Sequence, residues 1–374
     1  MRKILKYIGK KRPAAPAATH AGSDVPLEID AADITRAYLI YLGRPPENDA
    51  VIDFHLDHFR TWDRLCAALE ESQESRDRFD LLYPHDRPTF SIEDIDDLVH
   101  CFHHHDIEKY RDHVLRLPDW FDRFLDPDGP AYRDQMLKLW SAITGRASYD
   151  PLVDEDTPEV AEHDFLYRPG FYANGDAAMA GAHLIAIGHI LLRSNLPKNG
   201  RVLEYGAGFG QTAFNFARLG AKVDVVDVNP AFVRGVNSAS EFLRTDLTSY
   251  QGTFGVNPAG VPHAYDVILF YESFHHCLDA AALIEQMKSY LKPGGAILLA
   301  GEPISTSPIP EIPFPWGFRI DWENIAVMRQ RGWMELGFQQ PYLYHMFERA
   351  GFKGEMFTED NSHWAQVYRF TRSE

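Results

Sequence analysis

Cysteine is scarce in this sequence, which holds Cys66, Cys101 and Cys277 in 374 residues. An odd number of widely spaced cysteines excludes the kind of disulfide framework that staples small secreted domains. A reducing compartment fits this pattern best, and we therefore predict a cytoplasmic location.

Positive charge is also in short supply. The sequence has 37 lysines and arginines against 54 aspartates and glutamates, and its formal net charge is -17. Proteins that bind nucleic acids usually present a basic face, because contacts with phosphates provide much of their affinity. The charge therefore argues against a nucleic acid as the partner.

Long apolar runs are missing as well. No segment approaches the ~20 consecutive apolar residues that a helix needs to cross a bilayer, so no transmembrane span is predicted. Residues 1–24 combine a basic cluster with an Ala/Pro-rich stretch, which predicts a flexible tail. The only membrane interaction that this tail suggests is a weak peripheral contact with an anionic surface.

The rest of the chain divides into three regions. Residues 25–85 carry apolar side chains at three- and four-residue steps, which predicts a small helical domain. Residues 86–164 are mainly helical in pattern and acidic. Residues 165–374 alternate segments of strand and helix character. A chain of this length is expected to form more than one domain.

Part of the first helical region has a recognisable sequence. Tyr38-Leu39-Ile40-Tyr41-Leu42-Gly43-Arg44-Pro45 is followed by Glu71-Ser72-Gln73-Glu74-Ser75 and Phe79. This stretch resembles a small helical domain of unknown function that is found in bacterial surface and glycan-assembly proteins. The resemblance implies a role near glycan assembly in the cell envelope.

A run of histidines occupies the second helical region. His100 and His104 would share one face of a helix, a spacing that can hold a metal, and His103 and His105 lie beside them. No carboxylate at a matching position accompanies them, so a polar helix end is the alternative. No metal-binding residue is predicted.

The C-terminal region has the pattern of an α/β fold. Strands are predicted at 201–205, 222–227, 265–271, 296–300 and 364–371, and helices at 211–219, 280–291 and 342–350. Strands that alternate with helices are typical of a parallel sheet with helices on both faces.

The first of these strands ends in Glu204-Tyr205-Gly206-Ala207-Gly208-Phe209-Gly210. Glycines at a turn between strand and helix let the backbone approach a ligand closely. A dinucleotide fingerprint needs its third glycine at position 211, which is Gln211. The spacing instead resembles motif I of the class I S-adenosylmethionine-dependent methyltransferases.

Later motifs extend the resemblance over residues 165–374. Asp227 ends the second strand, Asp246 is placed after the third strand, and Leu291-Lys292-Pro293-Gly294-Gly295 leads into the fifth. The family implies a Rossmann-like, seven-stranded doubly wound sheet whose last strand is antiparallel. It also implies S-adenosylmethionine as cofactor, with Asp227 on the ribose hydroxyls and Asp246 on the adenine amino group. The implied cofactor-binding residues are Glu204, Gly206, Ala207, Gly208, Gly210, Asp227, Val228, Asp246, Leu247, Tyr271 and Tyr172.

Candidate catalytic residues follow the fourth strand. Glu272, His275 and His276 emerge at the carboxyl edge of the sheet, where ligands bind in such folds. A histidine with a pKa near ~6.5 can accept a proton from a hydroxyl at neutral pH. We predict His275 or His276 as the base, and Glu272 as a hydrogen-bond acceptor on the cofactor side or as an orienting group. Adjacent side chains are expected to face different ways, so one histidine at most should be catalytic.

Two further segments are expected near the acceptor. Glu302 follows the fifth strand, and residues 308–338 are rich in proline and aromatic residues, which predicts a lid or an acceptor wall. Upstream, Tyr172 or Arg168 is expected to meet the methionine end of the cofactor.

The sequence therefore predicts a methyltransferase that modifies a carbohydrate or another small acceptor, as an O-methyltransferase of cell-envelope glycan assembly. One alternative is a scaffold that binds the cofactor without turnover. A second is a nicotinamide-dependent oxidoreductase, which Gln211 disfavours. The acceptor and the oligomeric state are not predicted.

Overall fold

The computed structural model describes residues 29–373, apart from residues 105, 157 and 158. The predicted tail at residues 1–24, with its membrane contact, and His105 lie outside the described residues.

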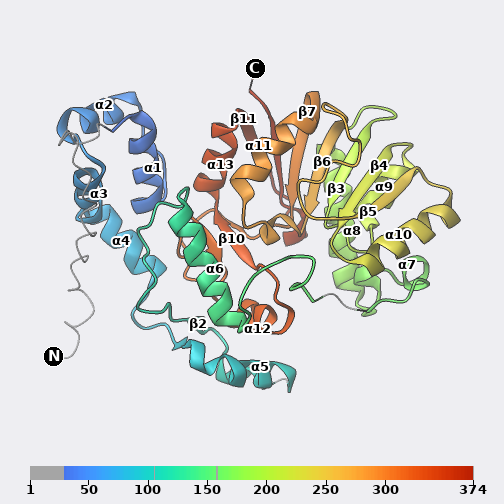
Figure 1. The fold of residues 1–374 in the computed structure, drawn as a ribbon, viewed down its shortest axis with the longest axis horizontal. Helices are drawn as coiled ribbons and strands as arrows, with labels where there is room; N and C mark the ends of the chain where they lie inside the picture. The colour runs from blue at the N-terminus through green and yellow to red at the C-terminus, as the bar shows by residue number, and fades with distance from the viewer. Residues whose placement is uncertain (1–28, 105, 157–158, 374) are drawn as a thin grey trace.

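A seven-stranded sheet forms the centre of the C-terminal half (Figure 1). Its order in space is β11-β12-β7-β6-β3-β4-β5. The strands from β3 to β7 pair in parallel, and β12 is antiparallel to both β7 and β11. The predicted Rossmann-like sheet with an antiparallel last strand is confirmed. Its strands are β3 (Arg201–Tyr205), β4 (Lys222–Asp227), β5 (Leu247–Gln251), β6 (Tyr265–Tyr271), β7 (Leu291–Ala300), β11 (Phe352–Phe357) and β12 (Val367–Arg372).

Helices cover both faces of this sheet because successive strand residues enter different cores. On β3, Val202 joins a cluster with residues of α8, α9 and α10, whereas Leu203 and Tyr205 join a cluster with residues of α11 and α13. Burial on both faces explains why the central strands are almost continuously apolar. The helices are α8 (Ala177–Ser194), α9 (Gln211–Arg218), α10 (Pro230–Leu243), α11 (Ala280–Tyr290) and α13 (Gln340–Arg349).

The segment predicted as a lid or acceptor wall has structure of its own. A small sheet of order β8-β10-β9 and the helix α12 lie between β7 and α13. Their bounds are β8 (Ile304–Ser305), β9 (Trp316–Phe318), α12 (Trp322–Arg331) and β10 (Leu336–Gln339). The small sheet places this segment beside the carboxyl edge of the main sheet, since β8 follows β7 directly.

The N-terminal half is mainly helical, as its periodicity predicts. Helices α1 to α3 enclose a core of their own around Ile34 and Leu65. Leu115 and Trp140, by contrast, belong to the same core as Phe338 of β10, so this core crosses the predicted boundary at residue 164. The elements are α1 (Ala31–Tyr41), α2 (Asp49–His58), α3 (Trp62–Glu70), α4 (Gln73–Leu82), β1 (Thr89–Phe90), α5 (Ile95–His103), β2 (Val114–Leu115), α6 (Pro130–Thr144) and α7 (Asp164–Tyr167).

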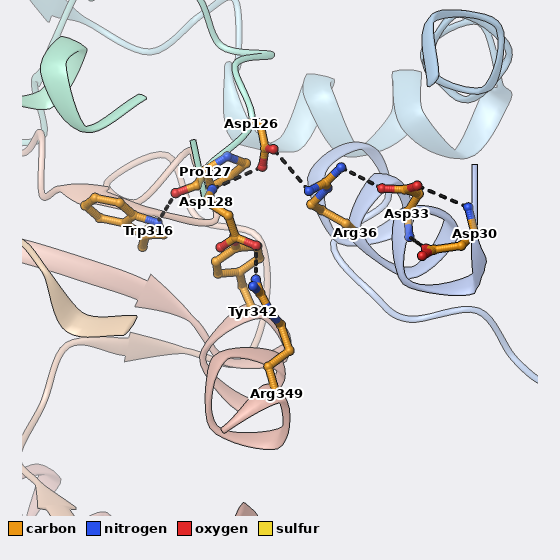
Figure 2. Close-up of polar contacts among 9 residues, drawn as sticks. All are labelled: Asp30, Asp33, Arg36, Asp126, Pro127, Asp128, Trp316, Tyr342 and Arg349. Carbon is orange, nitrogen blue, oxygen red and sulfur yellow. Dashed lines mark hydrogen bonds and ion pairs between the residues drawn. The ribbon is translucent and has the colours of Figure 1, made fainter. Parts of the chain in front are cut away.

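Polar contacts join the two halves through the loop before α6 (Figure 2). Asp126 pairs with Arg36 of α1 at 3.2 Å. Asp128 accepts a hydrogen bond of 2.5 Å from the Tyr342 hydroxyl of α13 and pairs with Arg349. The indole N–H of Trp316 donates to the carbonyl oxygen of Pro127 at 3.2 Å. One loop thus contacts α1, β9 and α13.

Helix α8 bears on the expectation that the chain has no transmembrane span. By length and composition alone it could cross a membrane, because its 18 residues have a mean hydropathy of 1.3. It packs against β7, β12 and a 3-10 turn, η6 (His363–Ala365), with Ile187 and Ile190 buried, while Leu192 on its outer face is exposed. In this structure α8 is a covering helix of the sheet.

Candidate functional site

The glycine-rich turn lies where the strand order reverses, between β3 and its neighbours β4 and β6. Ligands of doubly wound folds bind at such a switch point. Gly206, Gly208 and Gly210 all have positive φ angles, of 65°, 53° and 69°. A Cβ on Gly206 would lie 2.7 Å from the Ser273 side chain, whereas a Cβ on Gly208 would meet only Phe232, at 3.9 Å. The turn therefore packs tightly against Ser273 at Gly206 and has open space beside Gly208.

Asp227 holds this turn from the neighbouring strand. Its carboxylate accepts hydrogen bonds from the backbone N–H groups of Gly208, at 3.0 Å, and Asn229, at 2.8 Å. Burial raises the pKa of Asp227, and the two backbone donors oppose that effect. A carboxylate placed in this way can also accept hydrogen bonds from a ligand, because each oxygen has two lone pairs.

Glu204 lies beneath the turn and does not line the cleft that the turn borders. Burial raises the pKa of Glu204 to about 8, while the backbone N–H of Ala213 favours its ionised form. Its Oε2 atom is enclosed and has no hydrogen-bond partner. The structure therefore supports a role for Glu204 inside the domain and gives it no access to a ligand.

The expectation for Asp246 and Leu247 is wrong. Leu247 is the first residue of β5 and pairs with Val223 at the start of β4. These two residues therefore lie at the amino edge of the parallel sheet, opposite the edge that carries Asp227. Leu247 is also buried in the core. The carboxyl end of β5 leads instead to Gly252, Thr253 and Phe254, which line the cleft.

A cleft of about 740 Å³ opens at the turn. Four predicted cofactor residues line it: Gly206, Gly208, Asp227 and Val228. The N-terminal half contributes Arg133, Tyr149, Pro151 and Glu155, which no local motif revealed. Other residues that line the cleft include Asn229, Phe232, Leu278, Asp279, Ala282, Leu283 and Gln286.

Other predicted cofactor residues lie outside the lining of this cleft. Ala207 and Gly210 belong to the turn but are absent from the lining. Tyr271 donates its hydroxyl to, or accepts from, Nδ1 of His183 at 2.6 Å. Tyr172 is 40% exposed and packs on Phe171. Their predicted contacts with a cofactor stay predictions.

A second cleft, of about 700 Å³, adjoins the first. Glu272, His276 and Trp333 line both clefts. The second cleft has many charged side chains, and much of its wall comes from residues 309–335 of the segment predicted as a lid or acceptor wall. Its role toward an acceptor stays a prediction. Its remaining lining includes His275, Glu302, Glu311, Arg319, Asp321, Asn324, Glu335, His363 and Trp364.

Glu272 stands at the junction in a strained conformation. Its φ angle is 52°, in the left-handed region that residues with a side chain rarely adopt. Burial and, next, the nearby negative charge of Glu302 raise the pKa of Glu272 to about 7. The carboxyl group can therefore exchange a proton near neutral pH.

Glu302 orients His275. Its carboxylate accepts hydrogen bonds from the backbone N–H groups of Ser273, Phe274 and His275, and from Nδ1 of His275 at 2.8 Å. Burial opposes the charge of Glu302, but His275 and the backbone donors outweigh it and hold the pKa of Glu302 below its usual value. Glu302 lines the second cleft, and its predicted place near the acceptor stays a prediction.

Both histidines face the second cleft, which corrects the expectation that only one could. They lie on a 3-10 turn, η5 (Phe274–His276), and their ring centroids are 4.3 Å apart. Burial and the neighbouring His275 lower the pKa of His276 to about 4. Nδ1 of His276 is enclosed and has no hydrogen-bond partner.

The histidine run on α5 is not part of this site. The rings of His100 and His104 do share a face, with centroids 4.3 Å apart. Among the residues that the structure describes, however, the one group of three metal-ligand atoms within 4.8 Å consists of His275, His276 and Glu335.

Comparison with known proteins agrees with the motifs. Residues 182–355 match the family model described as a methyltransferase domain, which confirms the predicted C-terminal methyltransferase domain over those residues. The chain is 28% identical over 116 residues to the ubiquinone biosynthesis O-methyltransferase of Vibrio cholerae serotype O1, covering 31% of this chain and 47% of that protein. It is 31% identical over 121 residues to the Xanthomonas campestris pv. campestris protein of the same name, covering 31% and 48%. The chain thus spans about half the length of the curated relatives it matches.

Among solved structures, one similar chain is the 1,6-didemethyltoxoflavin-N1-methyltransferase of Burkholderia thailandensis. Its TM-score is 0.39 at 17% identity, and the match covers 59% of this chain and 93% of that one. That structure contains 1,6-didemethyltoxoflavin and S-adenosylhomocysteine.

Proposed function

We propose that this protein transfers a methyl group from S-adenosylmethionine to a hydroxyl oxygen of a small polyhydroxylated acceptor, and that carbohydrates are the class that fits best. The observation that carries the proposal is the meeting of two clefts at Glu272, His276 and Trp333. The methyltransferase-domain match supports the reaction type. The names of the curated relatives support oxygen as the receiving atom.

The first cleft fits the cofactor. Asp227 retains lone pairs for two ribose hydroxyls beside the backbone N–H groups that it already accepts. Gly208 presents bare backbone to open space, and Phe232 and Phe254 provide flat apolar surfaces for an aromatic base. When bound, the cofactor supplies a methyl carbon that is electrophilic because a sulfonium sulfur carries it.

The chain must then position the acceptor oxygen and remove its proton. Positioning alone can supply much of the rate. We assign proton removal to Glu272, because it lines both clefts and its pKa of about 7 suits a base at neutral pH. His276, with a pKa lowered to about 4, is a weaker proton acceptor, and His275 lines the second cleft alone.

The second cleft supports a carbohydrate. Carboxylates of Glu335 and Asp321 can accept hydrogen bonds from hydroxyl groups, and the indoles of Trp333 and Trp364 provide faces on which a sugar ring can stack. A place in cell-envelope glycan assembly rests on the N-terminal resemblance alone and stays a prediction, as does the cytoplasmic location.

Calorimetry and a turnover assay test the proposal. The full chain should bind S-adenosylmethionine and not a nicotinamide dinucleotide, which separates it from an oxidoreductase. Incubation with a panel of sugars and sugar phosphates should then release S-adenosylhomocysteine with at least one of them. Binding without turnover on any hydroxyl compound would favour the scaffold alternative.

A further inference from the structure

We propose that His275, His276 and Glu335 bind a divalent transition-metal ion in the second cleft. One potential ligand atom from each residue lies within 4.8 Å of the other two. Two histidines and one carboxylate are a ligand set suited to zinc, manganese, iron or cobalt, and three protein ligands leave coordination positions open to a substrate.

The first ligand is already oriented for coordination. Because the Glu302 carboxylate accepts a hydrogen bond from Nδ1 of His275 at 2.8 Å, the free lone pair of this imidazole lies on Nε2. That Nε2 atom is 3.7 Å from the Glu335 carboxylate. Two ligands that bind one ion at ~2.0–2.2 Å stand about 3–4 Å apart, so this separation suits a shared ion. Carboxylate–histidine–metal arrangements of this kind are common in metalloproteins.

One ring nitrogen of the second ligand, His276, lacks a hydrogen-bond partner. Nδ1 of His276 is enclosed without a hydrogen bond, which is costly for a buried polar atom. Its ring lies 4.3 Å from that of His275, on the same turn η5. Coordination by a ring nitrogen of His276 would bring this side chain into a satisfied polar network.

The third ligand lies in an excess of negative charge. Glu335 is buried on the loop before β10 and is bonded by Arg319, and its oxygens retain lone pairs for a second partner. Arg319 is the one lysine or arginine in the described lining of this cleft, against the carboxyl groups of Glu272, Glu302, Glu311, Asp321 and Glu335. A bound dication would compensate that excess.

The role of the ion rests on the proposed function. An ion held by these three residues faces the acceptor cleft, so it can bind the acceptor hydroxyl and stabilise the negative charge that develops on its oxygen. The hydroxyl proton passes to the Glu272 carboxylate, and the O–CH3 bond forms as the S–CH3 bond of the cofactor breaks. Glu272 lies at the junction where such a transfer is required.

The binding test needs neither cofactor nor acceptor, so its outcome is separate from that of the methyltransferase proposal. The full chain is treated with a chelator, dialysed and titrated with Zn²⁺ by calorimetry, and with Co²⁺ while its visible absorption is recorded. We expect one ion per chain. His276→Ala and Glu335→Gln should each weaken binding at least tenfold, and Glu302→Gln should weaken it by about 10–100-fold through the orientation of His275.

The matched control uses the other close pair of histidines. A His100→Ala/His104→Ala variant removes two rings whose centroids are also 4.3 Å apart but which have no third ligand among the described residues. This variant should keep the affinity and the Co²⁺ spectrum of the wild type. Cofactor affinity and circular dichroism of each variant check that it is folded. An absence of binding to the wild type, or a loss confined to the His100/His104 variant, would overturn the proposal.

Discussion

The backbone N–H of Gly208 donates a hydrogen bond of 3.0 Å to the Asp227 carboxylate, so the turn after β3 and the end of β4 form one unit. Asp227→Asn should weaken S-adenosylmethionine binding by about 10–100-fold, because hydrogen bonds to a charged acceptor contribute about 1.5–3 kcal/mol. Calorimetry measures the change. Asp246→Asn is the control, because Asp246 lies at the opposite edge of the sheet and should bind the cofactor like the wild type. Equal losses in both variants would contradict this geometry.

Two glycines of the same turn should respond differently to alanine. Gly208→Ala places a methyl group in the open space of the cleft, where the cofactor is proposed to lie, and so should weaken cofactor binding. The positive φ angle of this residue should also cost about 1–2 kcal/mol of stability. Gly206→Ala bears a similar φ penalty and adds a contact of 2.7 Å with the Ser273 side chain. Thermal unfolding should therefore show a larger loss for Gly206→Ala. The interpretation fails if the order of the two melting temperatures is reversed.

The sequence predicts the central strands of the sheet, but it does not reveal β5, the third strand of the C-terminal domain along the chain. Strands β3, β4 and β6 are buried on both faces, so their apolar runs mark them and the predicted bounds agree with the structure. β5 is an edge strand with the sequence Leu-Thr-Ser-Tyr-Gln, and only two of its residues are buried. Because no apolar run marks this strand, the sequence pattern puts it too early and so puts Asp246 at the wrong edge of the sheet.

Part of the site was likewise beyond local sequence patterns. Glu155 and Tyr149 come from the N-terminal half and Glu335 from the segment between α12 and β10, and no motif links them to the glycine-rich turn. Tertiary packing alone brings them to the two clefts. Sequence motifs identify Gly206, Gly208, Asp227 and Glu272, because each lies at or just after the end of a recognisable strand.

Removal of the proposed base should affect turnover and leave cofactor binding intact. Glu272→Gln keeps the shape of the side chain but cannot accept the hydroxyl proton, so kcat should fall by about 10²–10⁴-fold. In wild-type protein without added metal, activity should rise with pH through about 7, since Glu272 acts as a base when it is ionised and its pKa is raised to that value. Assays of S-adenosylhomocysteine release across pH 5–9 measure this rise in activity. A Glu272→Gln variant with unchanged kcat would assign proton removal elsewhere.

Glu204 should make the protein less stable as the pH rises from about 4.5 to about 8. Its pKa is raised from 4.5 in the unfolded chain to about 8 in the fold, so the folded state binds one more proton between these values. Stability from this group is complete below pH ~4.5 and falls by at most about 1.4 kcal/mol per pH unit until pH ~8. Urea unfolding from pH 5 to pH 8 measures the slope. Glu204→Gln should flatten it, and equal slopes in both proteins would rule out a protonated Glu204.

Asp128 makes two different contacts with α13, a buried hydrogen bond and an exposed ion pair (Figure 2). The hydroxyl of Tyr342, a residue that is 1% exposed, donates a hydrogen bond of 2.5 Å to Asp128. The side chain of Arg349, the other partner of Asp128, is largely exposed. Asp128→Ala leaves the buried hydroxyl unpaired and should cost about 1–3 kcal/mol in urea unfolding. Asp128→Asn retains an acceptor for Tyr342 and loses mainly the exposed pair, which is worth about 0–1 kcal/mol. If both variants lose the same stability, the ion pair and not the hydrogen bond holds the loop before α6 on α13.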